Sequence, residues 1–210
     1  MRKVIWMRIG KQKGKVYDDH RARDRYIIET GYLICELFYK LFVESGMNIK
    51  EKIQTQLRAM ARQDQEIRKS GKWNKMVDRG NTKKLKAIIK KFGWPDIDLV
   101  GRADSHSAWL IAQHADHDVR FQEECLALME ARREKIDPIE IAYLSDRIRV
   151  NRGERQLYGT QFYVNKSGKL VPRPICDKKN LDQRRERLGM GNFRECWKRL
   201  AKSHNKLDKK

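Results

Sequence analysis

The sequence of 210 residues contains only four prolines, and no stretch of it is rich in proline or in glycine and serine. Flexible linkers and low-complexity tracts usually show such stretches. Hydrophobic residues make up 40% of the chain, which is enough for a packed core. We therefore expect a folded chain of one ordinary domain, with room for an added N-terminal element.

Cysteine is also scarce. The four cysteines, Cys35, Cys125, Cys176 and Cys196, lie far apart and include no CxxC pair. A disulfide framework would be denser, and a structural zinc site would show closely spaced ligands. The sequence therefore predicts four reduced thiols in a cytoplasmic protein, and it indicates no metal and no cofactor.

No long uninterrupted apolar run is present. The longest one, Ile27 to Val43, contains Glu29, Glu36 and Lys40, which argues against a membrane-spanning helix. The basic stretch Met1 to Lys15 lacks the apolar segment and the cleavage site of a signal peptide. We expect no membrane span.

Positive charge is abundant, since 48 Lys and Arg face 28 Asp and Glu, for a net charge of +20. Such a balance indicates anionic partners: nucleic acid, with RNA ahead of DNA, or a ribonucleoprotein assembly. Residues 101–150 differ from the rest, because they hold seven basic and ten acidic residues. A solvated surface that only keeps the chain soluble is the alternative explanation of the excess charge.

The candidate contacts to nucleic acid form an N-terminal arm, a central patch and a C-terminal group. They are Arg2, Lys3, Lys11, Lys13, Lys15, Lys83, Lys84, Lys86, Lys90, Lys91, Arg194, Lys198, Arg199 and Lys202. Trp6, Trp73 and Trp197 lie near these stretches and could stack on bases, although core positions would explain them equally. No RRM, KH, helix-turn-helix or zinc-finger signature is present, so binding would be driven by phosphates and weakly sequence-specific.

Helical spacing of apolar residues dominates the chain. It predicts helices over residues 24–45, 48–70, 81–91, 104–117, 119–133, from Pro138 past Ile148, and 181–202 with a break near 189–191. The sequence Asp137-Pro138-Ile139-Glu140 is a strong helix start, with a cap, a proline at the first position and a glutamate three residues after the cap.

The period changes after residue 155. Residues 156–164, the turn 165–168 and residues 169–171 are typical of a β-hairpin. The predicted fold is therefore mainly α, a helical bundle or orthogonal helix array with one β-hairpin near residues 156–171. We expect residues 1–50 to form an extension with a basic arm and an apolar helix, residues 51–202 the helical domain, and residues 203–210 a basic tail.

Five short motifs occur in a fixed order. They are Phe-Gly-Trp-Pro at 92–95, Ala-Trp-Leu-Ile-Ala-Gln-His-Ala-Asp at 108–116, Asp146-Arg147, Gln-Leu-Tyr-Gly-Thr-Gln at 156–161 and Leu-Asp-Gln-Arg-Arg-Glu-Arg-Leu-Gly at 181–189. Over about residues 54 to 190, including Leu57 to Arg68, the chain resembles an uncharacterised bacterial family of unknown function. The resemblance implies no activity. It singles out Gln113, His114, Asp116, Arg147, Gln156, Tyr158, Gly159, Gln161, Arg184 and Arg185 as positions of interest.

One interpretation of these residues is a catalytic site. His114 would act as general acid or base, oriented by Asp116, Asp146 or a backbone group. Arg147, Arg184 and Arg185 would bind a phosphate or carboxylate, with Gln113, Gln156, Tyr158 and Gln161 fixing the ligand by hydrogen bonds. The function would be that of a hydrolase or transferase acting on a small phosphorylated or anionic ligand.

Three alternatives remain open from the sequence. His106, Gln113 and His117 would share one helix face, and His114 with His117 could hold a metal if another element supplied a carboxylate. The same polar residues could instead form a buried network that locks the hairpin onto the helices, with Gly159 needed only for close backbone approach. In a third reading the chain is a scaffold whose apolar helix at 24–45 binds a protein partner.

Overall fold

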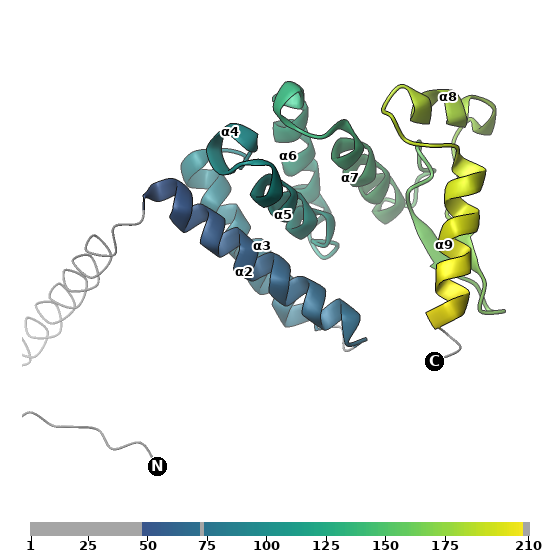
Figure 1. Ribbon diagram of the computed structural model, residues 1–210, viewed down its shortest axis with the longest axis horizontal. Helices are drawn as coiled ribbons and strands as arrows, with labels where there is room; N and C mark the ends of the chain where they lie inside the picture. Colours follow the sequence, from purple (N-terminus) through teal and green to yellow (C-terminus); the bar gives the residue numbers. More distant parts are fainter. Residues whose placement is uncertain (1–47, 72–73, 208–210) are drawn as a thin grey trace, which may run out of the picture. The chain divides into compact units, whose positions relative to one another are not determined.

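The computed structural model describes residues 48–71 and 74–207, which belong to one compact unit, Asn48–Lys210 (Figure 1). The expected basic arm and the apolar helix at 24–45 lie outside the described residues. Within the described residues, no helix has both the length and the apolar character needed to cross a membrane.

The described chain is mainly helical with one short hairpin, as the sequence predicts. Its elements are α2 Ile49–Lys69, α3 Lys75–Phe92, α4 Ile97–Val100, α5 Arg102–Gln113, α6 Val119–Glu130, η1 Arg133–Lys135, α7 Pro138–Asn151, β1 Phe162–Val164, β2 Leu170–Pro172, η2 Lys178–Asn180, α8 Leu181–Glu186 and α9 Phe193–Leu207. Helix α5 is central, since it packs against α2, α3, α4, α6 and α7, whereas α9 packs on β2 and α8 (Figure 1).

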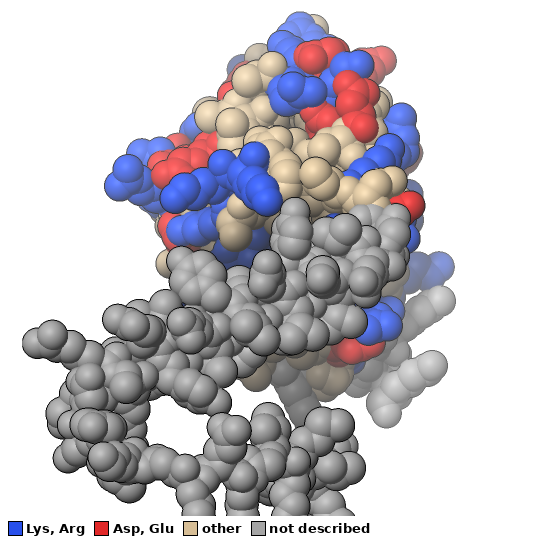
Figure 2. All heavy atoms as spheres, turned by 90° about the vertical axis from the view of Figure 1, so that its left-hand side faces the viewer, with Lys and Arg blue, Asp and Glu red and all other residues tan. Residues whose placement is uncertain are grey.

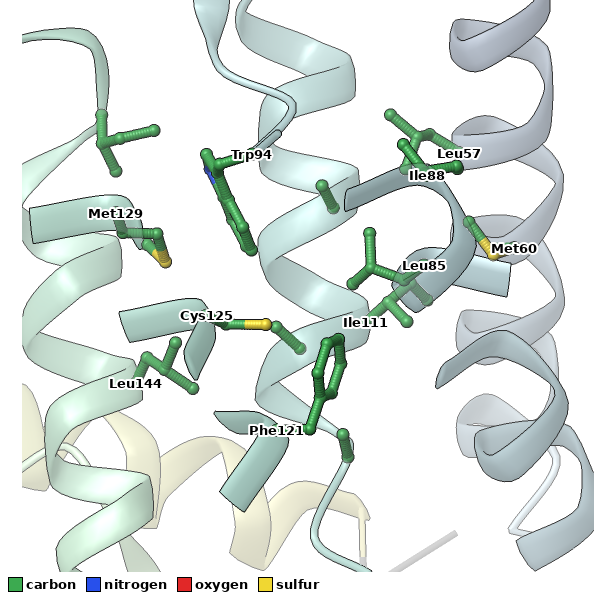
Figure 3. Packing of buried hydrophobic residues seen from close by; sticks show 14 of the residues in the cluster. Leu57, Met60, Leu85, Ile88, Trp94, Ile111, Phe121, Cys125, Met129 and Leu144 are labelled. Carbon is green, nitrogen blue, oxygen red and sulfur yellow. The ribbon is translucent and has the colours of Figure 1, made fainter. Parts of the chain in front are cut away.

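One hydrophobic core holds the helices together. It is built from α2, α3, α5, α6 and α7, and Figure 3 shows Leu57, Leu85, Ile111, Cys125 and Leu144 converging from these five helices. All five side chains are fully or almost fully buried. Since each buried aliphatic side chain contributes about 1.5–3 kcal/mol, this core fixes how α2, α5 and α7 lie, and these helices carry the polar site described below.

Helix α3 starts earlier than the sequence predicts. It begins at Lys75, not near residue 81, because the Asn74 side chain accepts a hydrogen bond from the backbone N–H of Met76 and caps the first turn. At the other end, Gly93 adopts φ +75° and Trp94 is buried. The motif at 92–95 therefore ends α3, as the sequence predicts.

Helix α5 ends earlier than the sequence predicts. It stops at Gln113, so the expected helix through His117 is wrong in its last turn. The Gln122 side-chain amide donates to the carbonyl oxygens of Ala112 and Gln113 and so satisfies the helix end. His117 consequently lies in the α5–α6 loop and does not share a helix face with His106 and Gln113.

Residues 156–161 form a loop, not the first strand of the hairpin. The buried Asp146 carboxylate of α7 accepts hydrogen bonds from the backbone N–H groups of Leu157, Tyr158 and Thr160 and from the Thr160 hydroxyl. Backbone groups bound in this way cannot pair with a second strand. The hairpin is confined to β1 and β2, with Phe162 opposite Pro172.

The helix expected over residues 181–202, with a break near 189–191, consists of two separate helices, α8 and α9, in the structure. Helix α8 ends before Gly189, which adopts φ +67°, and α9 continues to Leu207, beyond the expected end at residue 202. Phe193 of α9 stacks between Phe162 of β1 and Trp197. Trp197 also donates its indole N–H to the Leu170 carbonyl, so it serves to attach α9 to the hairpin.

Candidate active site

His114 is held by a buried carboxylate that sequence reasoning did not predict. Asp64 of α2 is 1% exposed, and its two carboxylate oxygens lie 2.9 and 3.0 Å from Nδ1 of His114. Arg68, one turn further along α2, donates from Nε to the same carboxylate at 3.1 Å. His114 follows the end of α5, so packing of α2 on α5 brings the pair together.

Nδ1 of His114 lies close to both Asp64 oxygens and also 3.0 Å from Nε of Arg68. Because an ionised carboxylate can only accept, the two Asp64 contacts favour the tautomer in which Nδ1 carries the proton and Arg68 Nε donates to Asp64. Burial alone would raise the pKa of Asp64, but the His114 hydrogen bond and the Arg68 guanidinium outweigh it and hold that pKa below its ordinary value. Nε2 of His114 is then the acceptor nitrogen, and it makes no hydrogen bond with a described residue.

Two neighbouring cavities lie at His114 and at Arg68. The first, of about 290 Å³, is lined by Lys75, Asp78, Arg79, His114, Asp116 and His117. The second, of about 340 Å³, is lined by Ile67, Arg68, Gly71, Asp78, Asp116 and Arg147. They share Asp78 and Asp116, so they form one polar depression between α2, α3, the α5–α6 loop and α7.

Asp116 is held by α7 rather than by His114. Its carboxylate accepts two hydrogen bonds from the Arg147 guanidinium and a third from Asn151. Burial raises the pKa of Asp116, but Arg147 outweighs it, so the pKa lies below its ordinary value. The predicted orienting partners of His114 were Asp116 and Asp146, and the structure places Asp64 in that position instead.

Charges in the depression are largely paired. Arg68 donates to Asp78 at 3.0 Å as well as to Asp64, and Arg147 binds Asp116. Arg79, just after the first turn of α3, is exposed and forms no ion pair with any described residue. The depression therefore offers a free guanidinium beside a histidine with an available nitrogen.

The three central histidines do not share one cavity. His114 and His117 line the same cavity, whereas His106 contacts Glu140 at 2.7 Å and stacks on Trp109 outside it. Between residues 48 and 71 and between 74 and 207, no group of three His, Cys, Asp or Glu side chains is placed to hold a metal ion.

Most of the predicted ligand residues bind protein groups. Arg184 donates to the carbonyls of Leu157, Cys176 and Asp177, and Arg185 donates to those of Tyr158 and Gly191. These contacts occupy both guanidinium groups, which hold the 156–161 loop against α8. They match the buried-network alternative more closely than a phosphate site.

The glutamines differ among themselves. Gln156 is fully buried and bonds the backbone of Gln161 and Arg173. Gln161 accepts from Arg147 at 3.1 Å and so touches the Asp116–Arg147 pair. Gln113 is 6% exposed, and its side-chain oxygen is buried without a hydrogen-bond partner. Tyr158 does not line either of the two cavities.

The candidate nucleic-acid contacts are partly described. Those on α3 and α9, namely Lys83, Lys84, Lys86, Lys90, Lys91, Arg194, Lys198, Arg199 and Lys202, are all exposed, while those before residue 48 lie outside the described residues. Only Lys86 among these nine forms an ion pair with a described residue, Asp118, at 2.6 Å. On the face shown in Figure 2, basic side chains are interspersed with acidic and uncharged ones.

A larger hollow of about 490 Å³ lies beside the 92–95 motif. It is lined mostly by apolar side chains such as Phe92, Leu99 and Leu128, together with the Asp96–Arg132 ion pair. No histidine or cysteine lines it. We therefore place the candidate active site at His114, whose imidazole ring offers both a hydrogen-bond donor and an acceptor at a polar cavity.

Sequence reasoning missed Asp64, Arg68, Asp78 and Arg79. A usable signal exists for Asp64, because it continues the buried series Ile53, Leu57, Met60 by one helical turn. A carboxylate on the apolar face of a helix must be paired inside the fold. Which group pairs with it is decided by packing between residues 50 positions apart.

Comparison with known proteins gives one family. A family described as "Family of unknown function (DUF6624)" matches residues 51–208, and this span includes all the residues of the depression. No curated protein and no solved structure matches the chain.

Proposed function

The chain belongs to the family of unknown function DUF6624, and because that family supplies no activity, we propose from the geometry that the protein is an acid–base enzyme acting on an anionic substrate. The reaction is a hydrolysis or a group transfer, with His114 as the group that moves the proton. The observation that carries this proposal is the hydrogen bond from His114 Nδ1 to the buried Asp64 carboxylate, which leaves Nε2 available in a cavity.

Each neighbour of His114 has a defined role in this proposal. Asp64 fixes the tautomer and stabilises the imidazolium that forms when Nε2 takes a proton. Arg68 binds both Asp64 and Asp78 and so offsets part of their negative charge, which reduces the repulsion of an anion. Arg79 binds the substrate anion, because its guanidinium is exposed at the same cavity and forms no ion pair with a described residue.

The proposal is tested with inorganic phosphate and with bis(p-nitrophenyl) phosphate. Phosphate should shift the ring-proton NMR signals of His114 and His117 and leave those of His106 in place. His114→Ala should lower hydrolysis of the ester by about 10²-fold or more, as expected when a general base is lost. His106→Ala is the matched control, since His106 lies outside the cavity.

Unfolding of the variant must be separated from loss of chemistry. His114→Asn keeps a side-chain N–H that can donate to Asp64 but has no nitrogen that can take up a proton at neutral pH. A folded His114→Asn protein with unchanged hydrolysis, or phosphate that leaves the His114 signals unmoved, would contradict the proposal.

We also propose that the exposed basic side chains of α3 and α9 bind nucleic acid. On α9, Arg194, Lys198 and Lys202 follow one another at intervals of four residues and form one exposed row. None of the three forms an ion pair with a described residue. Because such contacts would be made to phosphates, the binding should depend steeply on salt and little on base sequence.

A further inference from the structure

The cavity at His114 holds a second histidine, which the proposed function does not use. His117 is exposed, follows His114 by three residues in the α5–α6 loop, and lines the same cavity. A single histidine can take up a proton or release one, but a pair can do both in one step on opposite sides of a reacting bond. Asp64 positions the His114 ring, whereas His117 is exposed to solvent.

A basic row on α3 leads away from this cavity. At about 100° per residue, Lys75, Arg79, Lys83, Lys86 and Lys90 fall within an arc of about 80° on one flank of the helix. All five side chains are exposed, and Lys86 also forms an ion pair with Asp118. The first two line the cavity, and the whole row spans about 22 Å along the helix axis. A row of cations of this length suits an extended polyanion better than a small anion.

From these two observations we propose that the protein cleaves RNA, with His114 and His117 as the base and the acid and the α3 row as the binding track for the strand. This inference rests on the proposed acid–base function and names its substrate. RNA fits because each nucleotide carries its own nucleophile, the 2′-hydroxyl, next to the phosphodiester that is to be cleaved.

The step balances without any co-reactant. Nε2 of His114 takes the proton of the 2′-hydroxyl, and the 2′-oxygen forms a bond to the adjacent phosphorus. The bond from phosphorus to the 5′-oxygen breaks, and the leaving oxygen takes a proton from His117. The products are a 2′,3′-cyclic phosphate and a 5′-hydroxyl end. Arg79 lies where it can stabilise the extra negative charge on the phosphoryl oxygens during the step.

The substrate for the test is a labelled DNA oligonucleotide that contains one internal ribonucleotide, and the full chain is used. Cleavage should occur only at the 3′ side of that ribonucleotide, leave a cyclic phosphate and persist in EDTA. The all-DNA oligonucleotide and one with a 2′-O-methyl group at that position should stay intact, because neither has a free 2′-hydroxyl.

The histidines are tested by substitution. His114→Asn and His117→Ala should each reduce the rate by about 10²-fold or more, whereas His106→Ala should leave it unchanged. The wild-type rate should show a bell-shaped dependence on pH, and His117→Ala should remove its alkaline limb. Cleavage that all three variants retain would identify a contaminating nuclease and overturn the inference.

The α3 row has a matched control on the same helix. Lys83→Gln with Lys90→Gln should raise KM for the oligonucleotide severalfold and leave kcat unchanged. Lys84→Gln with Lys91→Gln changes the charge by the same amount on the other flank of α3 and should leave KM unchanged. Equal effects of the two pairs would show that the row is not a binding track.

The outcomes separate this inference from the proposed function. If phosphate perturbs His114 and the ester is hydrolysed while the ribonucleotide stays intact, the acid–base site stands and RNA is not its substrate. If neither ester nor ribonucleotide reacts and phosphate does not perturb His114, both proposals fail.

Discussion

At the scale of single residues, Gly159 shows how tightly the 156–161 loop packs on α9. It adopts φ +70°, and a Cβ atom built there would lie 2.6 and 2.7 Å from two ring carbons of Phe193. Phe193 cannot easily move away, since it stacks on Phe162 and on Trp197. The expectation that Gly159 serves close backbone approach therefore agrees with the packing.

This packing gives a prediction with a control in the same segment. Gly159→Ala should lower the free energy of unfolding for two reasons, the strain of a positive φ and the clash with Phe193. Gly168→Ala should lower it through the strain of a positive φ alone. Gly168 has φ +73° with no atom within 4 Å of an added Cβ. We expect the free energy of unfolding to fall by about 1–2 kcal/mol in Gly168→Ala. In Gly159→Ala it should fall by about 1–3 kcal/mol more, and urea unfolding measures both losses. Equal losses would mean that Phe193 gives way.

At the scale of elements, the candidate site depends on how the α5–α6 loop is fixed to α7. His106 and Trp109 contact Glu140 near the start of α7, and Asp116 contacts Arg147 two turns later. The two helices therefore run side by side in the same direction. The Asp116–Arg147 pair fixes the loop that carries His117 to α7.

A double-mutant cycle on Asp116→Asn and Arg147→Gln measures this attachment. Both side chains are partly exposed, 43% and 30%, so solvent weakens the pair. We expect a coupling of about 0.5–1.5 kcal/mol at neutral pH. Because the folded pKa of Asp116 is lowered, the stabilisation is present above the unfolded pKa and disappears as pH falls through the folded pKa. A coupling that persists in acid would contradict this assignment.

At the scale of the whole molecule, residues 101–150 form the one acidic stretch of the chain. The ion pairs and hydrogen bonds of its carboxylates show what these acidic side chains do in the fold. Three of its carboxylates meet basic side chains elsewhere in the fold: Asp104 binds Arg58, Asp118 binds Lys86, and Glu123 binds Arg152. The Asp146 carboxylate accepts hydrogen bonds from the backbone of the 156–161 loop. The acidic stretch therefore stabilises the helix array, and most of the basic side chains on α3 and α9 stay unpaired among the described residues.

We predict salt-sensitive binding of single-stranded RNA and DNA by the full chain. A complex with 6–10 phosphate contacts should lose about 10³–10⁵ in affinity between about 50 and 200 mM salt. Lys198→Gln with Lys202→Gln should flatten this salt dependence and reduce affinity for all sequences alike. The control pair Lys178→Gln with Lys179→Gln makes the same charge change in η2, away from the α9 row, and should have a smaller effect. Undetectable binding even at low salt would contradict the prediction.

The sequence by itself determined those features of the structure that depend on neighbouring residues, namely where helices begin and end. Asn48, Asp118 and Asp137 cap their helices, and the Gly93 and Gly189 breaks fall where they were expected, because a cap or a glycine acts on the nearest few residues. The same local patterns, with the motif order, predicted the mainly helical fold, the hairpin and the family.

The tertiary structure alone decided which polar groups meet. His114 pairs with Asp64, 50 residues earlier, and Asp146 turns an expected strand into a loop by binding its N–H groups. Arg184 and Arg185 bind carbonyls of the same loop. No spacing rule reaches across such distances, because the partner of a buried charge is set by how whole helices pack, and burial then requires that the charge be paired.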